Sequence, residues 1–302
     1  MKKLIFGLIL VILLCGLGNV AAIGNSKLAS GCQITTHFIS IGNGRLSYNQ
    51  VGTGEKPILL LHGLFASKEQ WNSMMCQLSE AGKTAIAPDL PGYADSKGFA
   101  TKDYALENQV TLLHQLTEQL EVGTLDLAGS SMGGTIAFLY SQRYPQHSRS
   151  VAFVGSPLGV TDWSSSVKNS ILDGINPFIP VTKEQFDLEI DLLFVTSPTI
   201  PDSIKTEKVK DYNTRNRHYQ KIWNIVNLYD RVLCQTKVTQ IPTLAIWGRQ
   251  DEIYDIRGVD RLQSCIHQSQ TIQLPKAGHL LLMENSEEAT ANYLKFLAEL
   301  SS

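Results

Sequence analysis

A Gly-x-Ser-x-Gly pentapeptide at residues 129–133 lies between a strand-like run and a helix-like run, and this context constrains the fold more than any other feature. Residues 124–128 predict a short buried strand, and residues 135–144 predict a helix that ends before Pro145. A serine at so sharp a turn needs small neighbours, because its backbone is strained and the strand and helix approach closely. Glycines at both ends of the pentapeptide provide that room. The context therefore predicts Ser131 as a nucleophile.

The pentapeptide alone is a weak signal, since roughly one chain in ten of this length would contain it by chance. A serine nucleophile also requires a base that takes its proton and a carboxylate that orients that base. Residues 243–248 predict another buried strand, and the loop after it carries Asp251 at the carboxyl end, where open α/β sheets place their sites. Residues 271–274 predict a further strand, whose loop leads to His279. The chain thus offers nucleophile, acid and base in the order Ser131, Asp251, His279.

The oxyanion of an acyl-transfer intermediate needs N–H donors as well. Residues 57–61 predict a continuous apolar strand that runs into His62-Gly63-Leu64-Phe65, where a glycine turn exposes backbone N–H groups. We expect this segment to be the oxyanion loop. For His62 we expect support of the turn geometry rather than proton transfer.

Each of the three catalytic candidates has an ordinary alternative. Ser131 and His279 could each be an ordinary loop residue without a catalytic role. His279, however, is the only one of seven histidines placed shortly after a late strand. Asp255 lies one helical turn beyond Asp251 and competes with it for the role of the acid. We favour Asp251 because it lies closer to the end of the strand.

Together these motifs resemble the α/β-hydrolase superfamily, and within it the membrane-associated monoacylglycerol lipase and esterase branch with an inserted cap. The resemblance covers about residues 38–300. Its most specific pieces are His-Gly-Leu-Phe at 62–65, Pro-Asp-Leu-Pro-Gly-Tyr at 88–93, Gly-Ser-Ser-Met-Gly-Gly at 129–134, Ile-Trp-Gly-Arg-Gln-Asp at 246–251 and Gly-His at 278–279.

Position by position, the resemblance implies Ser131 as nucleophile, His279 as base and Asp251 as the carboxylate that orients the base. It implies Leu64 and Met132 as the residues whose backbone N–H groups form the oxyanion hole. The implied fold is an α/β-hydrolase fold, a mostly parallel sheet flanked by helices with an inserted helical cap. The implied chemistry requires no cofactor and no metal.

The chain is expected to divide into four parts, because the alternation of strands and helices stops in its middle and then returns. These parts are residues 1–22, a signal peptide or membrane anchor; 33–156, the first part of the core; 157–237, the helical cap; and 238–302, the second part of the core. Within the first part, residues 38–48 predict a hairpin with Asn43-Gly44 at its turn.

Apolar side chains at helical spacing in the cap suggest a surface for the substrate. The candidate substrate-binding residues are Phe65, Phe186, Ile190, Leu193 and Phe194. The stretch 205–221 is rich in Lys and Arg, but Glu207 and Asp211 dilute its charge. For this stretch we favour a solvated helix face over a site for lipid headgroups.

The amino terminus has the pattern of a targeting segment. Lys2 and Lys3 precede an apolar run over residues 4–14, and small residues at 20–22 suit a signal peptidase, so that the mature chain begins at Ile23. The alternative is an uncleaved anchor over about residues 4–23. The protein is therefore expected to be exported, to the periplasm or the medium, or anchored in a membrane.

After removal of a signal peptide, the chain keeps an even number of cysteines. They are Cys32, Cys76, Cys234 and Cys265. In an oxidising compartment they predict one or two disulfides. Buried free thiols are the alternative.

The composition fits one catalytic domain and excludes several other functions. The 302 residues are 43% hydrophobic, which is enough for one sizeable core plus an insertion. A formal net charge of −2 without a basic run argues against nucleic-acid binding. Motifs for a metal or a nucleotide are absent from the sequence.

We therefore predict a serine hydrolase of carboxylic esters that acts on a small lipid or ester, with a monoacylglycerol as the leading substrate. Hydrolysis of a C–C bond, a thioester or an amide on the same scaffold is the alternative reaction. A noncatalytic binding protein is the alternative of a different class. The oligomeric state is left open.

Overall fold

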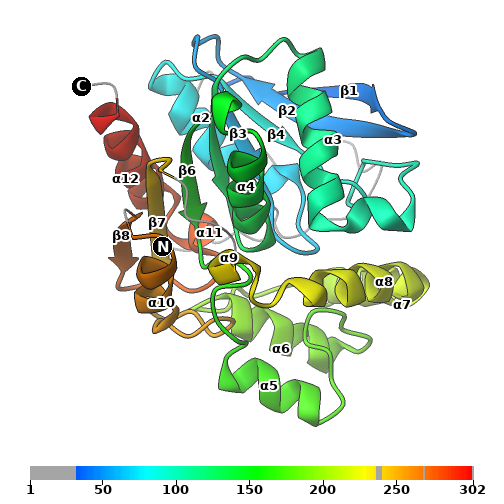
Figure 1. Ribbon diagram of the computed structural model, residues 1–302. Coiled ribbons are helices and arrows are strands. Elements are labelled where there is room, and N and C mark those ends of the chain that lie inside the picture. Colours follow the sequence, from blue (N-terminus) through cyan, green and yellow to red (C-terminus); the bar gives the residue numbers. More distant parts are fainter. Residues whose placement is uncertain (1–31, 236–239, 268, 301–302) are drawn as a thin grey trace.

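The computed structural model describes residues 32–235, 240–267 and 269–300, and an eight-stranded sheet forms its centre (Figure 1). The strand order is β1-β2-β4-β3-β5-β6-β7-β8. β2 pairs antiparallel with β1 and β4, and all other neighbours are parallel. This arrangement confirms the predicted fold class. The predicted targeting segment, residues 1–22, lies outside the described residues.

The central strands are buried on both faces. Every residue of β3, β5 and β7 is buried, because helices cover both sides of the sheet. This explains why these strands are nearly continuous apolar runs in the sequence. The strands are β1 Thr35–Ile41, β2 Gly44–Val51, β3 Ile58–Leu61, β4 Ala85–Pro88, β5 Leu125–Gly129, β6 Ser148–Val154, β7 Thr243–Gly248 and β8 Ser269–Leu274.

The hairpin between β1 and β2 differs by one residue from the sequence prediction. Ile41 pairs with Gly44, so the turn consists of Gly42-Asn43 rather than Asn43-Gly44. Gly42 has a φ of +56°, which a two-residue hairpin turn favours at its first position. The sequence has a glycine on each side of Asn43. The turn uses Gly42, which has the positive φ.

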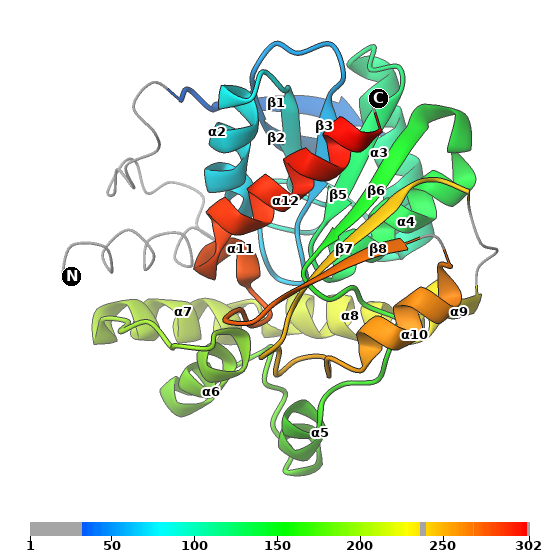
Figure 2. The same cartoon turned by 90° about the vertical axis from the view of Figure 1, so that its left-hand side faces the viewer.

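Two layers of helices enclose the sheet. α2 and α12 lie side by side on one face, and α3, α4 and α10 cover the other (Figure 2). Trp71 and Tyr293 are fully buried under the first layer, and Trp247 and Phe138 under the second. The bounds are α2 Asn72–Glu80, α3 Leu106–Gln119, α4 Met132–Arg143, α10 Gly258–Cys265 and α12 Ser286–Glu299.

Between β6 and β7 the chain leaves the sheet and forms a group of helices at the carboxyl ends of the parallel strands (Figure 1). We call them the inserted helices. They are α5 Ser165–Leu172, α6 Lys183–Leu193, α7 Asp202–Thr214, α8 Asn216–Val226, η4 Asn227–Tyr229 and α9 Val232–Gln235. The hydroxyls of Ser164 and Thr182 accept hydrogen bonds from backbone N–H groups and so cap α5 and α6.

Four short helices complete the description of the fold. They are η1 Lys68–Trp71, η2 Thr101–Tyr104, η3 Pro145–His147 and α11 Leu281–Glu284. None of the helices within the described ranges has the length and apolarity that a membrane-spanning segment requires.

Two disulfides join distant parts of the chain. Cys32 bonds to Cys76 of α2, with the Cα atoms 5.5 Å apart. Cys234 of α9 bonds to Cys265 of α10, with the Cα atoms 5.0 Å apart. The four cysteines thus form both disulfides that the sequence allowed, and the second bond ties the end of the inserted helices to the core.

Candidate active site

Ser131 lies at a strained turn between β5 and α4. Its φ of +51° and ψ of −120° are unusual for a residue with a side chain, and such strain is typical of functional positions. The neighbouring glycines are required by close approach of the backbone. A Cβ on Gly129 would lie 2.2 Å from the carbonyl carbon of Gly133, and one on Gly133 would lie 2.1 Å from the oxygen of Leu61. The pentapeptide therefore forms the tight strand–serine–helix turn expected from the sequence.

Asp251 and His279 lie together at the carboxyl ends of β7 and β8. Asp251 Oδ2 is 3.0 Å from His279 Nδ1, and both residues are more than nine-tenths buried. Asp251 Oδ1 accepts hydrogen bonds from the N–H groups of Ile253 at 2.8 Å and Tyr254 at 3.0 Å. These bonds fix the carboxylate, and the contact with Nδ1 leaves Nε2 of the imidazole free for proton transfer.

Ser156 contacts both members of this pair, and no motif in the sequence predicted it. The hydroxyl of Ser156 donates a short hydrogen bond to Asp251 Oδ2 and lies 3.0 Å from His279 Nδ1. Ser156 lies two residues beyond the end of β6 and is fully buried. A lone serine after a strand is common, so only the three-dimensional structure reveals its contact with both groups.

The rival acid Asp255 occupies a different environment. It forms an ion pair with Arg257, whose hydrogen bonds lower the pKa of the carboxyl to about 2. No hydrogen bond or ion pair joins Asp255 to His279 among the described residues. The geometry therefore favours Asp251 as the partner of His279.

Ser131 and His279 line the same cavity. Within the described ranges, the hydroxyl of Ser131 makes no hydrogen bond, and none joins it to His279. Such contacts between nucleophile and base are often long before substrate binds and tighten in the complex. The two side chains are therefore brought to one cavity but are not yet hydrogen bonded.

The loop after β3 lies beside Ser131. The N–H of Gly63 donates to Gln70 Oε1 at 3.2 Å, and Gln70 Nε2 donates to the Ser130 hydroxyl at 3.1 Å, so Gln70 links the two loops. The backbone N–H groups of Leu64 and Met132 have no acceptor among the described residues. Both residues line the cavity. Unpaired donors at this position are what an oxyanion hole requires.

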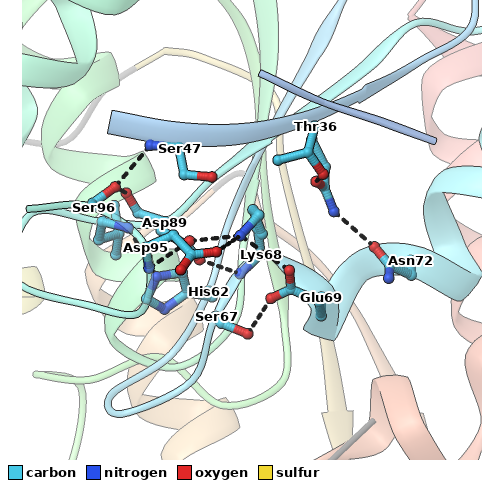
Figure 3. A network of polar contacts seen from close by, with 12 residues as sticks. Thr36, Ser47, His62, Ser67, Lys68, Glu69, Asn72, Asp89, Asp95 and Ser96 are labelled. Atoms are coloured by element: carbon cyan, nitrogen blue, oxygen red, sulfur yellow. Dashed lines mark hydrogen bonds and ion pairs between the residues drawn. The ribbon is translucent and has the colours of Figure 1, made fainter. Parts of the chain in front are cut away.

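A buried polar network supports this loop from behind (Figure 3). His62 donates from Nδ1 to the Gly63 oxygen at 2.8 Å and accepts at Nε2 from the Leu90 N–H at 2.9 Å. Burial lowers the pKa of His62 to about 4, so the imidazole is neutral. Lys68 pairs with Asp89 at 2.8 Å, and both side chains are almost completely buried. As expected from the sequence, His62 holds the turn rather than serving the reaction.

The cavity runs between the core and the inserted helices. Of the candidate substrate-binding residues, Phe65, Phe186, Ile190 and Leu193 line it. Phe194 does not, which corrects the sequence prediction. Helix α6 ends at Leu193, and Phe194 takes an extended conformation (φ −121°, ψ 145°). Its side chain packs in an apolar cluster with Phe186 and Ile190, which do line the cavity.

Polar residues of the inserted helices also line the cavity, and the sequence analysis missed them. They are Glu189, Lys208, Asp211, Tyr212 and Tyr219. The expected solvated face is wrong for Lys208, which is only 8% exposed. The signal for Glu189 was its place three residues after Phe186 and one before Ile190, where a charged residue interrupts the apolar spacing of α6.

A group of potential metal ligands lies outside this cavity. Among the described residues, one set of three, His114, Glu118 and His147, has ligand atoms within 4.8 Å of one another. None of the three lines the cavity.

Comparison with known proteins identifies the family. A model of the α/β-hydrolase fold matches residues 56–286, which is most of the chain. The chain belongs to the α/β-hydrolase family. Lipase 1 of Psychrobacter immobilis is 30% identical to this α/β-hydrolase over 251 residues, covering 80% of this chain and 76% of that protein.

Two further proteins similar to this α/β-hydrolase carry names that concern lipids. Monoacylglycerol lipase ABHD6 of Homo sapiens is 30% identical over 259 residues, covering 81% of this chain and 76% of that protein. A crystal structure described as a membrane phospholipase A and bacterial virulence factor superposes with a TM-score of 0.81 at 25% identity, covering 89% of this chain and 87% of that one. These relatives are hydrolases of carboxylic esters, the enzyme class that the sequence predicts.

Proposed function

We propose that this α/β-hydrolase cleaves lipid esters, with monoacylglycerols as the leading substrate class, through Ser131, His279 and Asp251. One observation carries the proposal: a strained serine and a hydrogen-bonded histidine–carboxylate pair open onto one largely apolar cavity. A noncatalytic binding protein has no need of the strained turn, the buried acid–base pair and the unpaired N–H donors together. Their coexistence favours catalysis.

The proposed reaction has two halves. His279 Nε2 takes the proton of the Ser131 hydroxyl as the oxygen attacks the ester carbonyl, and the N–H groups of Leu64 and Met132 stabilise the oxyanion. His279 then passes that proton to the departing alcohol, which leaves an acyl-serine. A water molecule loses its proton to His279, attacks the acyl-serine and releases the acid, and the proton returns to Ser131. Asp251 stabilises the imidazolium in both halves.

The lining of the cavity supports a lipid substrate. Aromatic and aliphatic side chains make up most of it, so an acyl chain gains free energy when it leaves water, by about 0.8 kcal/mol for each buried CH₂. The names of the relatives agree with this choice. We further propose that the inserted helices, within the expected range 157–237, act as a cap that controls entry to Ser131.

We also propose that the protein is exported or held at a membrane through its amino-terminal segment. The two disulfides support export, because such bonds form and persist in oxidising compartments. Expression of the full chain with separation of membrane, periplasmic and medium fractions tests this. Recovery of the protein in the cytosol with reduced cysteines contradicts it.

The Ser131→Ala variant tests the catalytic proposal. Turnover of a monoacylglycerol is expected to fall by about 10⁶, the scale seen when a triad serine is lost. Circular dichroism of the variant checks that the fold is retained. Near wild-type turnover in folded Ser131→Ala contradicts the serine mechanism, and a wild-type enzyme inactive on all glyceryl and p-nitrophenyl esters contradicts ester hydrolysis.

A further inference from the structure

The wall that the inserted helices contribute to the cavity contains a buried carboxyl group with unused hydrogen-bonding capacity. Glu189 of α6 is 8% exposed and lines the cavity. Its Oε1 accepts a hydrogen bond from the Tyr212 hydroxyl of α7 at 3.1 Å. Its Oε2 has no hydrogen-bond partner in the part of the chain that the structure describes. An unpaired polar group in a buried site costs stability, so a ligand that pairs with it gains correspondingly.

The protonation state of Glu189 determines whether its Oε2 can donate a hydrogen bond as well as accept one. Burial raises the pKa of the carboxyl to about 8, although the Tyr212 hydrogen bond and the Lys208 charge both favour the ionised form. At neutral pH the carboxyl is therefore protonated. With Oε1 engaged by Tyr212, Oε2 carries the hydrogen and acts as both donor and acceptor towards the cavity.

A second polar pair connects this wall to the loop beside Ser131. The Tyr219 hydroxyl of α8 donates to Asp211 Oδ2 of α7 at 2.6 Å. The ring of Tyr219 meets the ring of Phe65 edge to face, with centroids 5.1 Å apart. Phe65 follows Leu64, the proposed oxyanion donor. The polar wall therefore begins next to the position where the ester carbonyl is expected.

Aromatic side chains near His279 form another part of the cavity lining. Tyr254 lies 5.9 Å from His279 by ring centroids, and Trp163 stacks on Tyr254 at 4.9 Å. Phe178 packs against Trp163 at 5.3 Å. All three side chains line the cavity. The cavity lining thus includes a polar group that reaches Phe65 through Tyr219 and an aromatic group that reaches His279 through Tyr254.

We infer that Glu189, supported by Tyr212 and the Asp211–Tyr219 pair, forms a subsite that binds the hydroxyl groups of an uncharged polyol alcohol, such as the glyceryl group of the ester. This inference rests on the proposed function. The acyl chain takes the aromatic wall, because an alkyl chain has no partner for Oε2. A neutral Glu189 together with one cation, Lys208, and one anion, Asp211, gives the wall little net charge. That balance suits a hydroxyl-bearing group better than a phosphate.

The test compares pairs of esters that share one acyl chain. The measured quantity is kcat/KM for a glyceryl ester divided by kcat/KM for the matched n-propyl ester, which lacks the two free hydroxyls. We expect Glu189→Leu to lower this ratio by about tenfold, the equivalent of one lost hydrogen bond. We expect Glu189→Gln to retain most of it, since the amide keeps one donor and one acceptor. Glu207→Leu, an exposed position on α7, is the matched control and keeps the wild-type ratio.

Three outcomes overturn the inference. An unchanged ratio in folded Glu189→Leu means that the carboxyl does not contact the alcohol. A ratio that falls equally in Glu207→Leu assigns the effect to a general disturbance of the inserted helices rather than to the subsite. A wild-type preference for a glycerophosphate ester over the uncharged glyceryl ester assigns the wall to an anionic group. Failure of the proposed function differs from all three, because wild-type enzyme then hydrolyses neither ester.

Discussion

The core and the inserted helices hold their polar groups in opposite ways. At the carboxyl ends of β7 and β8, both oxygens of Asp251 are occupied, by two backbone N–H groups on one side and by Ser156 and His279 on the other. On α6, Glu189 uses only Oε1. A carboxyl group whose oxygens are both hydrogen bonded is held rigid before substrate binds. A carboxyl group with one unpaired oxygen can still form a hydrogen bond with a ligand. This difference agrees with the proposal that the core carries the chemistry and the inserted helices select the substrate.

We therefore expect substitutions in the core to lower activity on every ester alike. Substitutions in the inserted helices should lower activity on some esters more than on others. The largest effect is expected at Asp251. Asp251→Asn loses about 10⁴ in turnover for short and long esters, because an amide no longer fixes the useful tautomer of His279. Steady-state kinetics on acetate and long-chain esters measures this.

Asp255→Asn is the matched control for that change, since Asp255 pairs with Arg257 and not with His279. It is expected to change turnover little. If Asp255→Asn proves the more damaging of the two, the acid has been assigned to the wrong residue.

A pH effect on stability is expected from Glu189 in the inserted helices. Its pKa is about 8 in the fold and near 4.5 in the unfolded chain. Between these values the folded state binds more protons, so this group's contribution to stability is complete below pH 4.5 and is lost as the pH rises to 8. The melting temperature of wild type should therefore fall relative to that of Glu189→Gln over this range. A constant difference between the two proteins contradicts the buried, protonated carboxyl.

A smaller and selective effect is expected at Leu193, which lines the cavity. Leu193→Ala should weaken kcat/KM for medium and long acyl esters by about 1–3 kcal/mol while acetate and butyrate esters change little. Phe194→Ala is its control, because Phe194 packs in the apolar cluster beside α6. That variant should lose thermal stability and act on all chain lengths alike. An equal fall in kcat/KM for all acyl chain lengths in Leu193→Ala would contradict the assignment of Leu193 to a pocket for the acyl chain.

The smallest effect is expected at Ser156, a positioning residue of the core. Ser156→Ala removes the hydroxyl shared by Asp251 and His279 and is expected to lower kcat by about tenfold on every ester. The pH–rate profile should change as well, because the hydroxyl contacts both Asp251 and His279. A fall in melting temperature without any change in the profile points to a purely structural role.

The sequence predicted the core better than the insertion, for a physical reason. The elbow at Ser131 and the positions of Asp251 and His279 follow from local patterns, since each residue stands next to a strand end that its own neighbours define. Glu189, Lys208 and Tyr219 come to one cavity through the packing of α6, α7 and α8, and no local pattern encodes that packing. Even the error at Phe194 has this origin: helical spacing continued one residue beyond the end of α6.

The most direct test of the account is covalent labelling of Ser131. Wild-type protein treated with a fluorophosphonate, digested and examined by mass spectrometry should carry the adduct on the peptide that contains Ser131. Asp251→Asn should react much more slowly, and Ser131→Ala should not react at this site. Adduct on Ser130 or Ser156 instead of Ser131, or equal labelling of wild type and Asp251→Asn, would contradict the central claim that the core activates Ser131 through His279 and Asp251.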